Sequence, residues 1–167
     1  MILFRFGSDP LRTSKQEFNG AGGLKAEGRW HILGTPVVYA ANSEPLSLLE
    51  KLVHRKAAAP IAYPLYIADV PDNLLEELAL EDYPQDWRSI YPPDSTRALG
   101  NGWLESAAAV GLLVPSVLIS GVHGAHLKNC LINPLHPEFH QVELSGPISF
   151  AVDPRFPSGV ESSDLIA

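Results

Sequence analysis

Cysteine is almost absent from this chain, which has Cys130 as its single cysteine in 167 residues. An internal disulfide is therefore excluded, and a reducing cytosol is the natural compartment. Long apolar runs are also missing, since none approaches the roughly 20 residues that a membrane helix needs. The first residues, MILFRFGS, lack the basic start and the long apolar stretch of a signal peptide. These absences predict a cytoplasmic protein.

Basic residues are scarce relative to acidic ones, 12 against 19, which gives a formal net charge of −7. Direct binding of nucleic acid needs a basic surface, so this balance argues against it. The same balance is compatible with a basic protein partner. The length and the 46% share of hydrophobic residues fit one domain with its own core.

The usual metal and nucleotide signatures are lacking as well. Four histidines show H-x-x-H and H-x-x-x-H spacing, but neither a pair of zinc-binding cysteines nor H-E-x-x-H accompanies them. Pro137 would interrupt a regular helix between the last two of them. The cluster Gly20, Gly22 and Gly23 neither follows a strand nor opens a helix, so the Rossmann and Walker templates do not apply. We therefore predict no metal site at these histidines, which are His123, His126, His136 and His140.

The most informative stretch begins with a glycine-rich loop that carries Arg29. A strand over Thr35–Ala41 follows and carries Tyr39. A helix then opens near Ser43, a good N-cap residue, and carries Glu50. Glycines let the backbone approach a ligand closely, and free loop N–H groups suit phosphate oxygens. The loop, the strand and the helix together predict a ligand site.

The helix has an apolar face. Leu46, Leu49 and Val53 recur at helical spacing, with Leu52 beside them, which predicts that this face packs on the core. The predicted solvent side consists of Ser47, Lys51, His54 and Arg55.

Glu50 falls at the border of that apolar face. Desolvating a carboxylate there is costly unless another group pairs with it. Arg29 and Tyr39 are the nearest candidates along the sequence. From the pattern alone a structural Glu–Arg ion pair is the favoured interpretation, and a functional site is the alternative.

The rest of the chain alternates strands and helices, which predicts a single domain of mixed α/β or α+β class. Expected strands cover Ile2–Phe6, Ile61–Asp69 and Leu112–Ser120, and a closing hairpin covers Val142–Val152. Expected helices cover Asp72–Leu80 and a segment from Ser95 or Thr96 to Ala109. The segments expected to be irregular are Ser8–Gly23 and Tyr83–Asp94.

Prolines, glycines and aromatic residues add local detail. Pro64 indicates an edge or an irregular position in its strand. Gly100 and Gly102 allow close packing of their helix. In the proline-rich segment, Trp87 and Tyr91 are either anchors for a partner or part of this chain's own core.

Ser116 follows Pro115 in an apolar segment, so we expect it at a bulge or a sheet edge. A serine in such a place more often bonds the backbone than acts in catalysis. The G-x-S-x-G turn of a hydrolase nucleophile is absent.

The run G-R-W-x-x-x-G-T-P-V-V-Y, followed by L-x-L-L-E, resembles the RES-domain family, the toxin half of RES–Xre toxin–antitoxin pairs. That family is named for an arginine, a glutamate and a serine, which Arg29, Glu50 and Ser116 match. The later run L-I-N-P-L-H-P over Leu131–Pro137 is similar to its closing motif. The resemblance covers residues 1–157 and leaves residues 158–167 as a polar C-terminal tail.

The resemblance implies an α+β fold, a compact mixed sheet flanked by helices, similar to ADP-ribosyl-transferring toxins. It also implies a bacterial toxin that depletes NAD by cleaving the nicotinamide–ribose bond, through phosphorolysis or hydrolysis. A Xre-type helix-turn-helix antitoxin would neutralise it. NAD is then the substrate, inorganic phosphate is a candidate co-substrate, and no resident cofactor is required. Two alternatives remain: an ADP-ribosyltransferase that modifies a protein, and a non-catalytic acidic subunit that regulates a DNA-binding antitoxin.

Within this resemblance the expected catalytic residues are Arg29, Tyr39 and Glu50. Glu50 would face the ribose cation or hold the ribose hydroxyls. Arg29 would bind the pyrophosphate or an acceptor phosphate, and Tyr39 would stack on nicotinamide or bond its ribose. The remaining expected contacts to NAD come from Arg5, Ser116 and Asn133.

Overall fold

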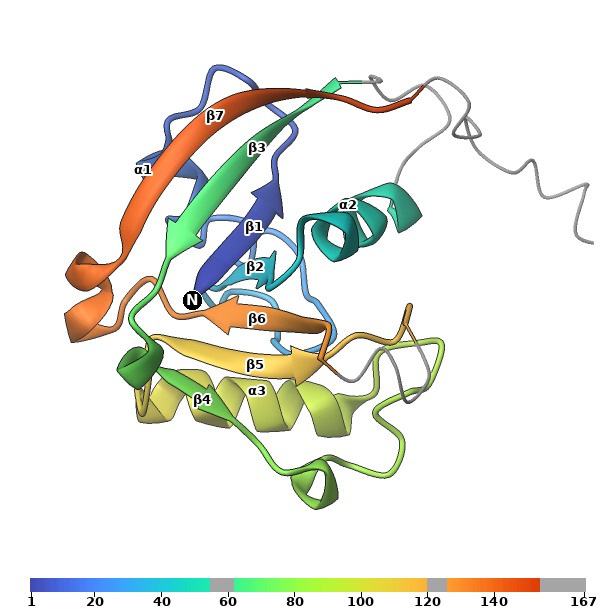
Figure 1. The fold of residues 1–167 in the computed structure, drawn as a ribbon. Coiled ribbons are helices and arrows are strands. Elements are labelled where there is room, and N and C mark those ends of the chain that lie inside the picture. The colour runs from blue at the N-terminus through green and yellow to red at the C-terminus, as the bar shows by residue number, and fades with distance from the viewer. Residues whose placement is uncertain (55–61, 120–125, 154–167) are drawn as a thin grey trace, which may run out of the picture.

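The computed structural model describes residues 1–54, 62–119 and 126–153. At its centre is a seven-stranded sheet with the strand order β4-β5-β6-β2-β1-β3-β7 (Figure 1). The strands are β1 (Ile2–Phe6), β2 (Val38–Ala41), β3 (Ala62–Asp69), β4 (Leu75–Glu77), β5 (Gly111–Pro115), β6 (Lys128–Ile132) and β7 (Glu143–Ala151). The helices are α1 (Ser14–Glu17), α2 (Glu44–Val53) and α3 (Asp94–Ser106), with 3-10 turns η1 (Asp72–Leu74), η2 (Leu80–Asp82) and η4 (Pro137–Gln141).

The sheet is mixed, because β4 and β5 run parallel whereas the other neighbouring strands run antiparallel. The prediction of one α+β domain with a mixed central sheet and flanking helices is confirmed. The strand expected over Ile2–Phe6 is β1 with both ends correct. β2 lies between β1 and β6, so Tyr39 occupies the middle of the sheet.

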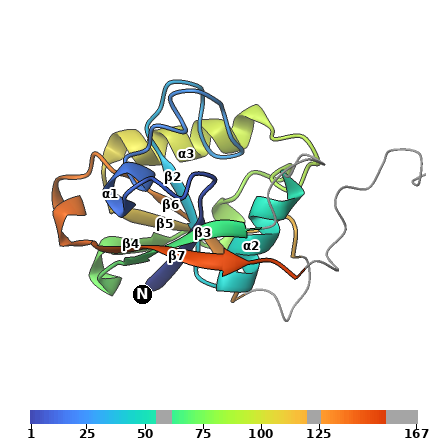
Figure 2. The ribbon, with the colours of Figure 1, turned by 90° about the horizontal axis from the view of Figure 1, so that it is seen from above.

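One transverse row of residues explains where the helices pack. Phe4 pairs with Ala41, Ala41 with Asn129, and Asn129 with Val114, so these residues share one face of the sheet. Val114 belongs to the core cluster that includes Trp103 of α3. At the other end of the row, Phe4 belongs to the cluster that packs against α2. Both helices therefore cover the same face, α3 along β5 and α2 against β1 and β2 (Figures 1 and 2).

The expected loop over Ser8–Gly23 contains the short helix α1. The Thr13 hydroxyl oxygen accepts a hydrogen bond from the Gln16 N–H at 3.3 Å, and the Gln16 carbonyl oxygen Oε1 accepts from the Thr13 N–H at 2.9 Å. This reciprocal pair is a capping box, and it starts a helix. The prediction of an entirely irregular segment is therefore wrong.

The helix expected over Asp72–Leu80 is also wrong. Only the short turns η1 and η2 are helical there, and β4 lies between them. Leu75 stands opposite Gly111 in the parallel pair of β4 and β5. A Cβ atom at Gly111 would lie 2.5 Å from Cδ2 of Leu75, so glycine permits this close approach. Pairing with a strand distant in sequence outweighs the helical spacing of the leucines.

The segment Val142–Val152 contains one long strand, β7 (Glu143–Ala151), rather than the predicted hairpin. β7 pairs with β3 from Ala151 opposite Ala62 to Glu143 opposite Asp69. The Gly146–Pro147 pair that suggested a turn lies within the strand and has a cis peptide bond.

Pro64 lies in β3, which has β1 on one side and β7 on the other. Of the two alternatives expected for this proline, the sheet edge is wrong. The irregular position fits, since the β3–β7 register shifts between Leu65 and Ile67.

The segment Tyr83–Asp94 is irregular up to α3, as predicted. Trp87 is buried beside Tyr83 in the chain's own core, whereas Tyr91 is 84% exposed. α3 ends at Ser106, before the expected Ala109, because Ala107 adopts a left-handed conformation with φ 46°. The expectations for Arg55, Ile61, Ser120, His123 and the tail 158–167 lie outside the described residues.

The two glycines of α3 differ in their surroundings, which yields a paired prediction. A Cβ atom at Gly100 would lie 1.9 Å from the backbone oxygen of Trp30, whereas a Cβ atom at Gly102 meets nothing within 4 Å. We expect Gly100→Ala to lower the free energy of unfolding by about 2 kcal/mol or more through overpacking. Gly102→Ala should be neutral or stabilising by up to about 1 kcal/mol, since alanine favours the helix. Chemical denaturation measures both, and equal effects would contradict the packing argument.

Candidate functional site

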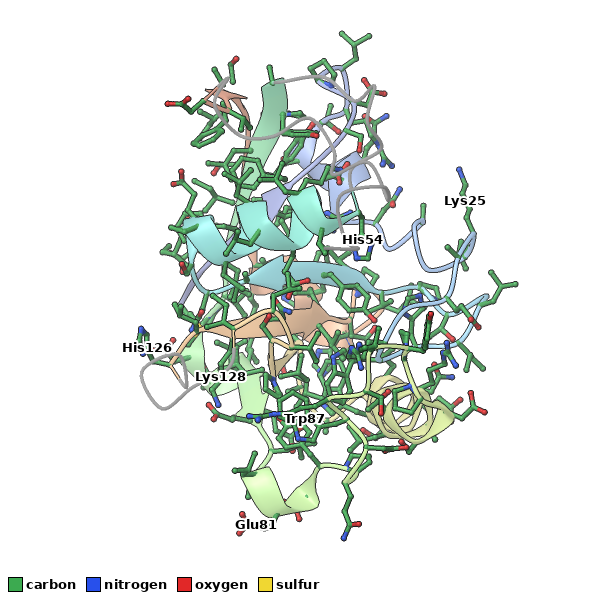
Figure 3. All side chains as sticks on the ribbon, turned by 90° about the vertical axis from the view of Figure 1, so that its right-hand side faces the viewer. Lys25, His54, Glu81, Trp87, His126 and Lys128 are labelled. Carbon is green, nitrogen blue, oxygen red and sulfur yellow. The ribbon has the colours of Figure 1, made fainter. Side chains whose placement is uncertain are left out.

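A cavity of about 610 Å³ opens between α2, the middle of the sheet and the loop that joins α1 to β2. Four of the predicted site residues line it, namely Arg5, Arg29, Tyr39 and Glu50. Figure 3 shows His54 at the end of α2, on the side that faces the loop with Lys25. His54 lines the same cavity, so the end of α2 forms part of its wall.

The carboxylate of Glu50, on α2, is held by two side chains from distant parts of the chain, one just after β5 and one in β6. Its oxygen Oε1 accepts hydrogen bonds from the Ser116 hydroxyl at 2.8 Å and from the Asn129 amide Nδ2 at 2.6 Å. Within the described residues, no hydrogen bond from a protein group reaches Oε2. Two donors on one oxygen fix the orientation of the carboxylate and leave the other oxygen available to a ligand.

Ser116 directs its hydroxyl proton at Glu50, while its oxygen accepts from the Leu118 N–H at 3.1 Å. It follows β5 and does not itself line the cavity. This arrangement suits a residue that orients the glutamate rather than a nucleophile, because its proton already has an acceptor. The expected direct contact of Ser116 with NAD is not supported by this position.

Asn129 is a site residue that the sequence reasoning missed. It lies in β6 opposite Ala41, and it lines the cavity. Its contact to Glu50 joins residues 79 positions apart in the chain. The available signal was weak, because Asn129 follows another polar residue, Lys128, at the start of a strand that is apolar only over its last three residues.

Among the described residues, Arg29 forms no ion pair with Glu50. The interpretation as a structural Glu–Arg ion pair is therefore wrong. Its guanidinium instead donates to the carbonyl oxygens of Trp87 at 2.9 Å, Ser89 at 2.9 Å and Ile90 at 3.3 Å. Burial lowers the pKa of Arg29, and the negative charge of Glu50 acts in the opposite direction. An arginine so placed stays cationic. It anchors the proline-rich segment at the cavity and brings positive charge to the site.

Tyr39 lies in a chain of hydrogen bonds with His31. The Tyr39 oxygen accepts from the Trp30 N–H at 3.1 Å and lies 2.8 Å from His31 Nδ1. His31 Nε2 lies 2.9 Å from the Ala26 carbonyl oxygen, which can only accept. Nε2 therefore carries the proton, and Nδ1 accepts from the Tyr39 hydroxyl when the ring is neutral. Burial raises the pKa of the Tyr39 phenol, so the hydroxyl stays a donor.

Arg5 connects the cavity with α1. Its Nε donates to Glu17 Oε1 at 2.9 Å, and its Nη1 donates to the Tyr39 carbonyl oxygen at 2.8 Å. Glu17 is buried and also accepts from Arg12 Nη1 at 3.2 Å. The expected place of Arg5 at the pocket agrees with the structure, and Glu17 fixes its orientation.

Asn133 lies away from the cavity. Its amide Nδ2 donates to the Leu104 carbonyl oxygen at 3.1 Å, and its Oδ1 accepts from the Leu135 N–H at 3.0 Å. The side chain is buried and ties the L-I-N-P-L-H-P motif to α3. This position gives no support to the predicted contact with NAD and indicates a structural role.

The faces of α2 differ from the prediction. Leu46 is fully buried as expected, but Leu49 is 41% exposed and Val53 is 55% exposed. Ser47 and Lys51, which were expected on the solvent side, line the cavity instead. The cavity takes the place of solvent on one side of the helix, so Ser47 and Lys51 line it, and of the two exposed apolar residues only Val53 reaches it. His54, from the same predicted solvent side, also lines the cavity.

The histidines form no evident metal site. Among the described residues, no group of three His, Cys, Asp or Glu side chains is placed to hold a metal ion. His136 is engaged in structure, with Nε2 3.0 Å from the Ala107 carbonyl oxygen and Nδ1 accepting from the Glu138 N–H. None of the described helices is long and apolar enough to cross a membrane.

Comparison with known proteins agrees with the motif and the fold. Residues 2–153 match the RES domain, so this chain belongs to the RES-domain family. It is 38% identical over 158 residues to a Toxin Res of Yersinia enterocolitica, with 93% of this chain and 99% of that protein covered. It is 30% identical over 157 residues to a Prs ADP-ribosylating toxin of a Sphingobium species, with 92% and 94% covered.

The fold also resembles a chain in the crystal structure of the M. tuberculosis MbcT–MbcA toxin–antitoxin complex. The TM-score is 0.67 at 18% sequence identity, with 90% of this chain and 84% of the other covered. The resemblance first seen in the Arg29, Glu50 and Ser116 motifs is thereby confirmed at the level of family and fold.

The environment of His31 predicts how the stability depends on pH. Burial lowers the pKa of His31 from its ordinary 6.5, so the fold favours the neutral ring. The unfolded chain takes up a proton near pH 6.5, hence this contribution is complete above that pH and is lost as the pH falls below it. His31→Gln can keep both hydrogen bonds and does not titrate. We expect its melting temperature to fall less than that of the wild type between about pH 7.5 and about pH 5.5, and equal falls would contradict the assignment.

Proposed function

We propose that this protein is a toxin that cleaves the bond between nicotinamide and ribose in NAD. The carrying observation is the carboxylate of Glu50, which is fixed through one oxygen by Ser116 and Asn129 and presents the other at a cavity. The cavity volume of about 610 Å³ lies within the range typical of small-molecule sites. The names of the relatives, Toxin Res and Prs ADP-ribosylating toxin, support the same class of activity.

Cleavage of the nicotinamide–ribose bond does not require a general acid to protonate the leaving group. As the C–N bond breaks, its electron pair passes to the ring nitrogen, and nicotinamide leaves as a neutral pyridine. The ribose carbon then carries positive charge in an oxocarbenium-like transition state. A fixed carboxylate stabilises such a cation without reorganisation, as in glycoside cleavage. Glu50 lines the cavity with a fixed carboxylate, which supports this role for it.

The acceptor completes the reaction. In phosphorolysis an oxygen of inorganic phosphate forms the new bond to the ribose carbon, and the products are ADP-ribose 1″-phosphate and nicotinamide. Arg29 would attract this phosphate through its positive charge, which lies near Glu50, because both terminal nitrogens of its guanidinium already donate to carbonyl oxygens. With water as acceptor the product is plain ADP-ribose. The name of the Sphingobium relative favours a second candidate, transfer of ADP-ribose to a protein from the same cavity.

A cytosolic enzyme that drains NAD would harm its own cell, so we also propose a Xre-type antitoxin that covers the cavity. The rim offers an apolar surface for such a partner, because Val53, Ile90 and Leu118 are exposed and line the opening. The net charge of −7 leaves DNA binding to the helix-turn-helix of the partner.

Glu50→Gln tests the catalytic role. The amide oxygen can still accept from Ser116 and Asn129, so the fold and the orientation should persist while the charge is lost. We expect nicotinamide release to fall by a factor of roughly 10² to 10³ or more. Chromatographic measurement of nicotinamide, with a thermal melt of each protein as control, checks this. Full turnover by a folded variant would exclude Glu50 from catalysis.

The same variant tests the toxin proposal in cells. Expression of the wild type should arrest growth and lower cellular NAD, whereas Glu50→Gln should do neither. Co-expression of a small helix-turn-helix protein encoded next to this chain should restore growth. Growth arrest by the variant would show that toxicity does not come from NAD cleavage.

The acceptor is identified by varying phosphate. If the reaction is phosphorolysis, the wild-type rate rises with phosphate and the product carries a 1″-phosphate. Arg29→Lys keeps the charge but loses the several donors that hold the carbonyl oxygens of Trp87, Ser89 and Ile90 at the cavity, so its KM for phosphate should rise by roughly ten-fold. A rate independent of phosphate with plain ADP-ribose as product would replace phosphorolysis by hydrolysis, and label on a protein would indicate transfer.

A further inference from the structure

We propose that His31 is a positioning residue that sets the direction of the Tyr39 hydroxyl proton and thereby makes the rate of NAD cleavage depend on pH. This inference rests on the proposed NAD cleavage. When His31 is neutral, the Tyr39 proton points at the imidazole, and the Tyr39 oxygen meets the ligand as an acceptor. When His31 is protonated, the direction reverses, and the Tyr39 hydroxyl meets the ligand as a donor.

The hydrogen bonds of His31 determine where the protons lie. Its Nε2 is 2.9 Å from the Ala26 carbonyl oxygen, which can only accept, so Nε2 carries the proton of the neutral ring. Nδ1 then presents a lone pair 2.8 Å from the Tyr39 oxygen, and the Tyr39 hydroxyl donates to it. Because His31 is only 4% exposed, bulk water does not compete for Nδ1.

Gly28 lies directly against this hydrogen bond. A Cβ atom at position 28 would lie 2.7 Å from the Tyr39 oxygen and 2.7 Å from His31 Nδ1. The Gly28 N–H donates to the His31 carbonyl oxygen at 3.1 Å, so the loop folds back over the pair. The side that Gly28 covers is closed to water, which leaves His31 as the acceptor of the Tyr39 proton.

The Tyr39 oxygen keeps one position for a ligand. Besides its bond to His31, it accepts from the Trp30 N–H at 3.1 Å, and no other protein group of the described chain bonds it. Tyr39 lines the cavity, and a phenol oxygen can accept a second hydrogen bond. The ligand group that completes it must therefore be a donor. The ribose hydroxyls of NAD are donors, whereas its phosphate oxygens are not.

The charged groups that face His31 have opposite signs. Glu27 comes from the same loop and Arg97 from α3, and they form an ion pair at 3.0 Å. Burial lowers the pKa of His31, the hydrogen bond to Ala26 and the charge of Glu27 oppose this, and Arg97 adds to it. The ring is therefore neutral at pH values above its ordinary pKa of about 6.5 and becomes protonated below it.

Protonation of His31 should slow the reaction for two reasons. A ribose hydroxyl that donates to Tyr39 gains electron density and stabilises the developing ribose cation, whereas one that accepts from Tyr39 loses it. A protonated ring also adds positive charge to a cavity in which a cation must form. Cleavage is thus fastest with the neutral ring and declines as the pH falls through the pKa of His31.

The pH profile of kcat/KM for nicotinamide release tests this role, with circular dichroism at each pH to show that the proteins are folded. His31→Gln offers Ala26 a donor and Tyr39 an acceptor, but it does not titrate. We expect the ratio of kcat/KM of this variant to that of the wild type to rise as the pH falls, by up to about ten-fold for each pH unit below the pKa of His31. His140→Gln removes an exposed histidine and should keep the wild-type profile. A ratio for His31→Gln that is independent of pH would overturn the proposal.

A double-mutant cycle tests whether His31 acts through Tyr39. At neutral pH, His31→Leu deprives the Tyr39 proton of its acceptor, so kcat/KM should fall by roughly ten-fold, and His31→Gln should restore most of the loss. In a Tyr39→Phe background, His31→Leu should have no further effect. An equal loss in that background would show that His31 supports the loop rather than the Tyr39 hydroxyl, and would overturn the proposal.

Nitrogen NMR of the imidazole rings in the wild-type protein needs neither activity nor a variant that folds poorly, since His31→Gln serves only to assign the signal. We expect the neutral tautomer with the proton on Nε2 and a pKa below the ordinary 6.5. The opposite tautomer in an active enzyme would overturn the role of His31 alone. If the wild type shows the expected tautomer but releases no nicotinamide, the proposed function has failed, and the kinetic role of His31 fails with it.

Discussion

The two hydrogen bonds to Oε1 of Glu50 join parts of the chain that are far apart in sequence. Glu50 comes from α2, Ser116 from the end of β5, and Asn129 from β6. The contacts exist only because the sheet brings β5 and β6 together in register and because α2 packs on the same face. The site is thus a consequence of the strand order. A carboxylate at that depth requires donors, and the fold supplies two of them.

The second constraint is the anchoring of the irregular segment before α3. Arg29 bonds three of its carbonyl oxygens, Trp87 packs into the core, and the Thr96 hydroxyl of α3 donates to the Arg29 carbonyl oxygen at 2.7 Å. Backbone carbonyls of a segment without strand partners need donors, and a guanidinium with several N–H groups meets that need. One arginine therefore shapes the cavity wall and contributes positive charge to it.

Those features of the fold and of the site that have a local signal could be predicted from the sequence. The alternation of Ile2, Phe4 and Phe6 gives β1, and Ser43 with Pro45 marks the start of α2. The loop, strand and helix around Arg29, Tyr39 and Glu50 also meet at one cavity as expected. These features depend on periodicity and on short-range capping, which single sequences contain.

The failures share a different cause, which is long-range context. The leucines after Asp72 have helical spacing, yet parallel pairing with β5 makes a strand of Leu75–Glu77. On α2, Leu49 and Val53 have core spacing, yet both are exposed, whereas Lys51 lines the cavity. Asn129 has only a weak local signal, because its role comes from a partner 79 residues away. A helical pattern states which residues share a face, but not whether that face meets a core, a cavity or solvent.

The same distinction applies to charge. An overall charge of −7 argues against binding a long polyanion such as DNA, which samples the whole surface. A small anionic substrate responds instead to the field inside its cavity, where low-dielectric walls strengthen the effect of each nearby charge. Arg5, Arg29 and Lys51 all line this cavity. Their positions, from β1, the glycine-rich loop and α2, would reconcile an acidic chain with the proposed substrate NAD, which carries a pyrophosphate.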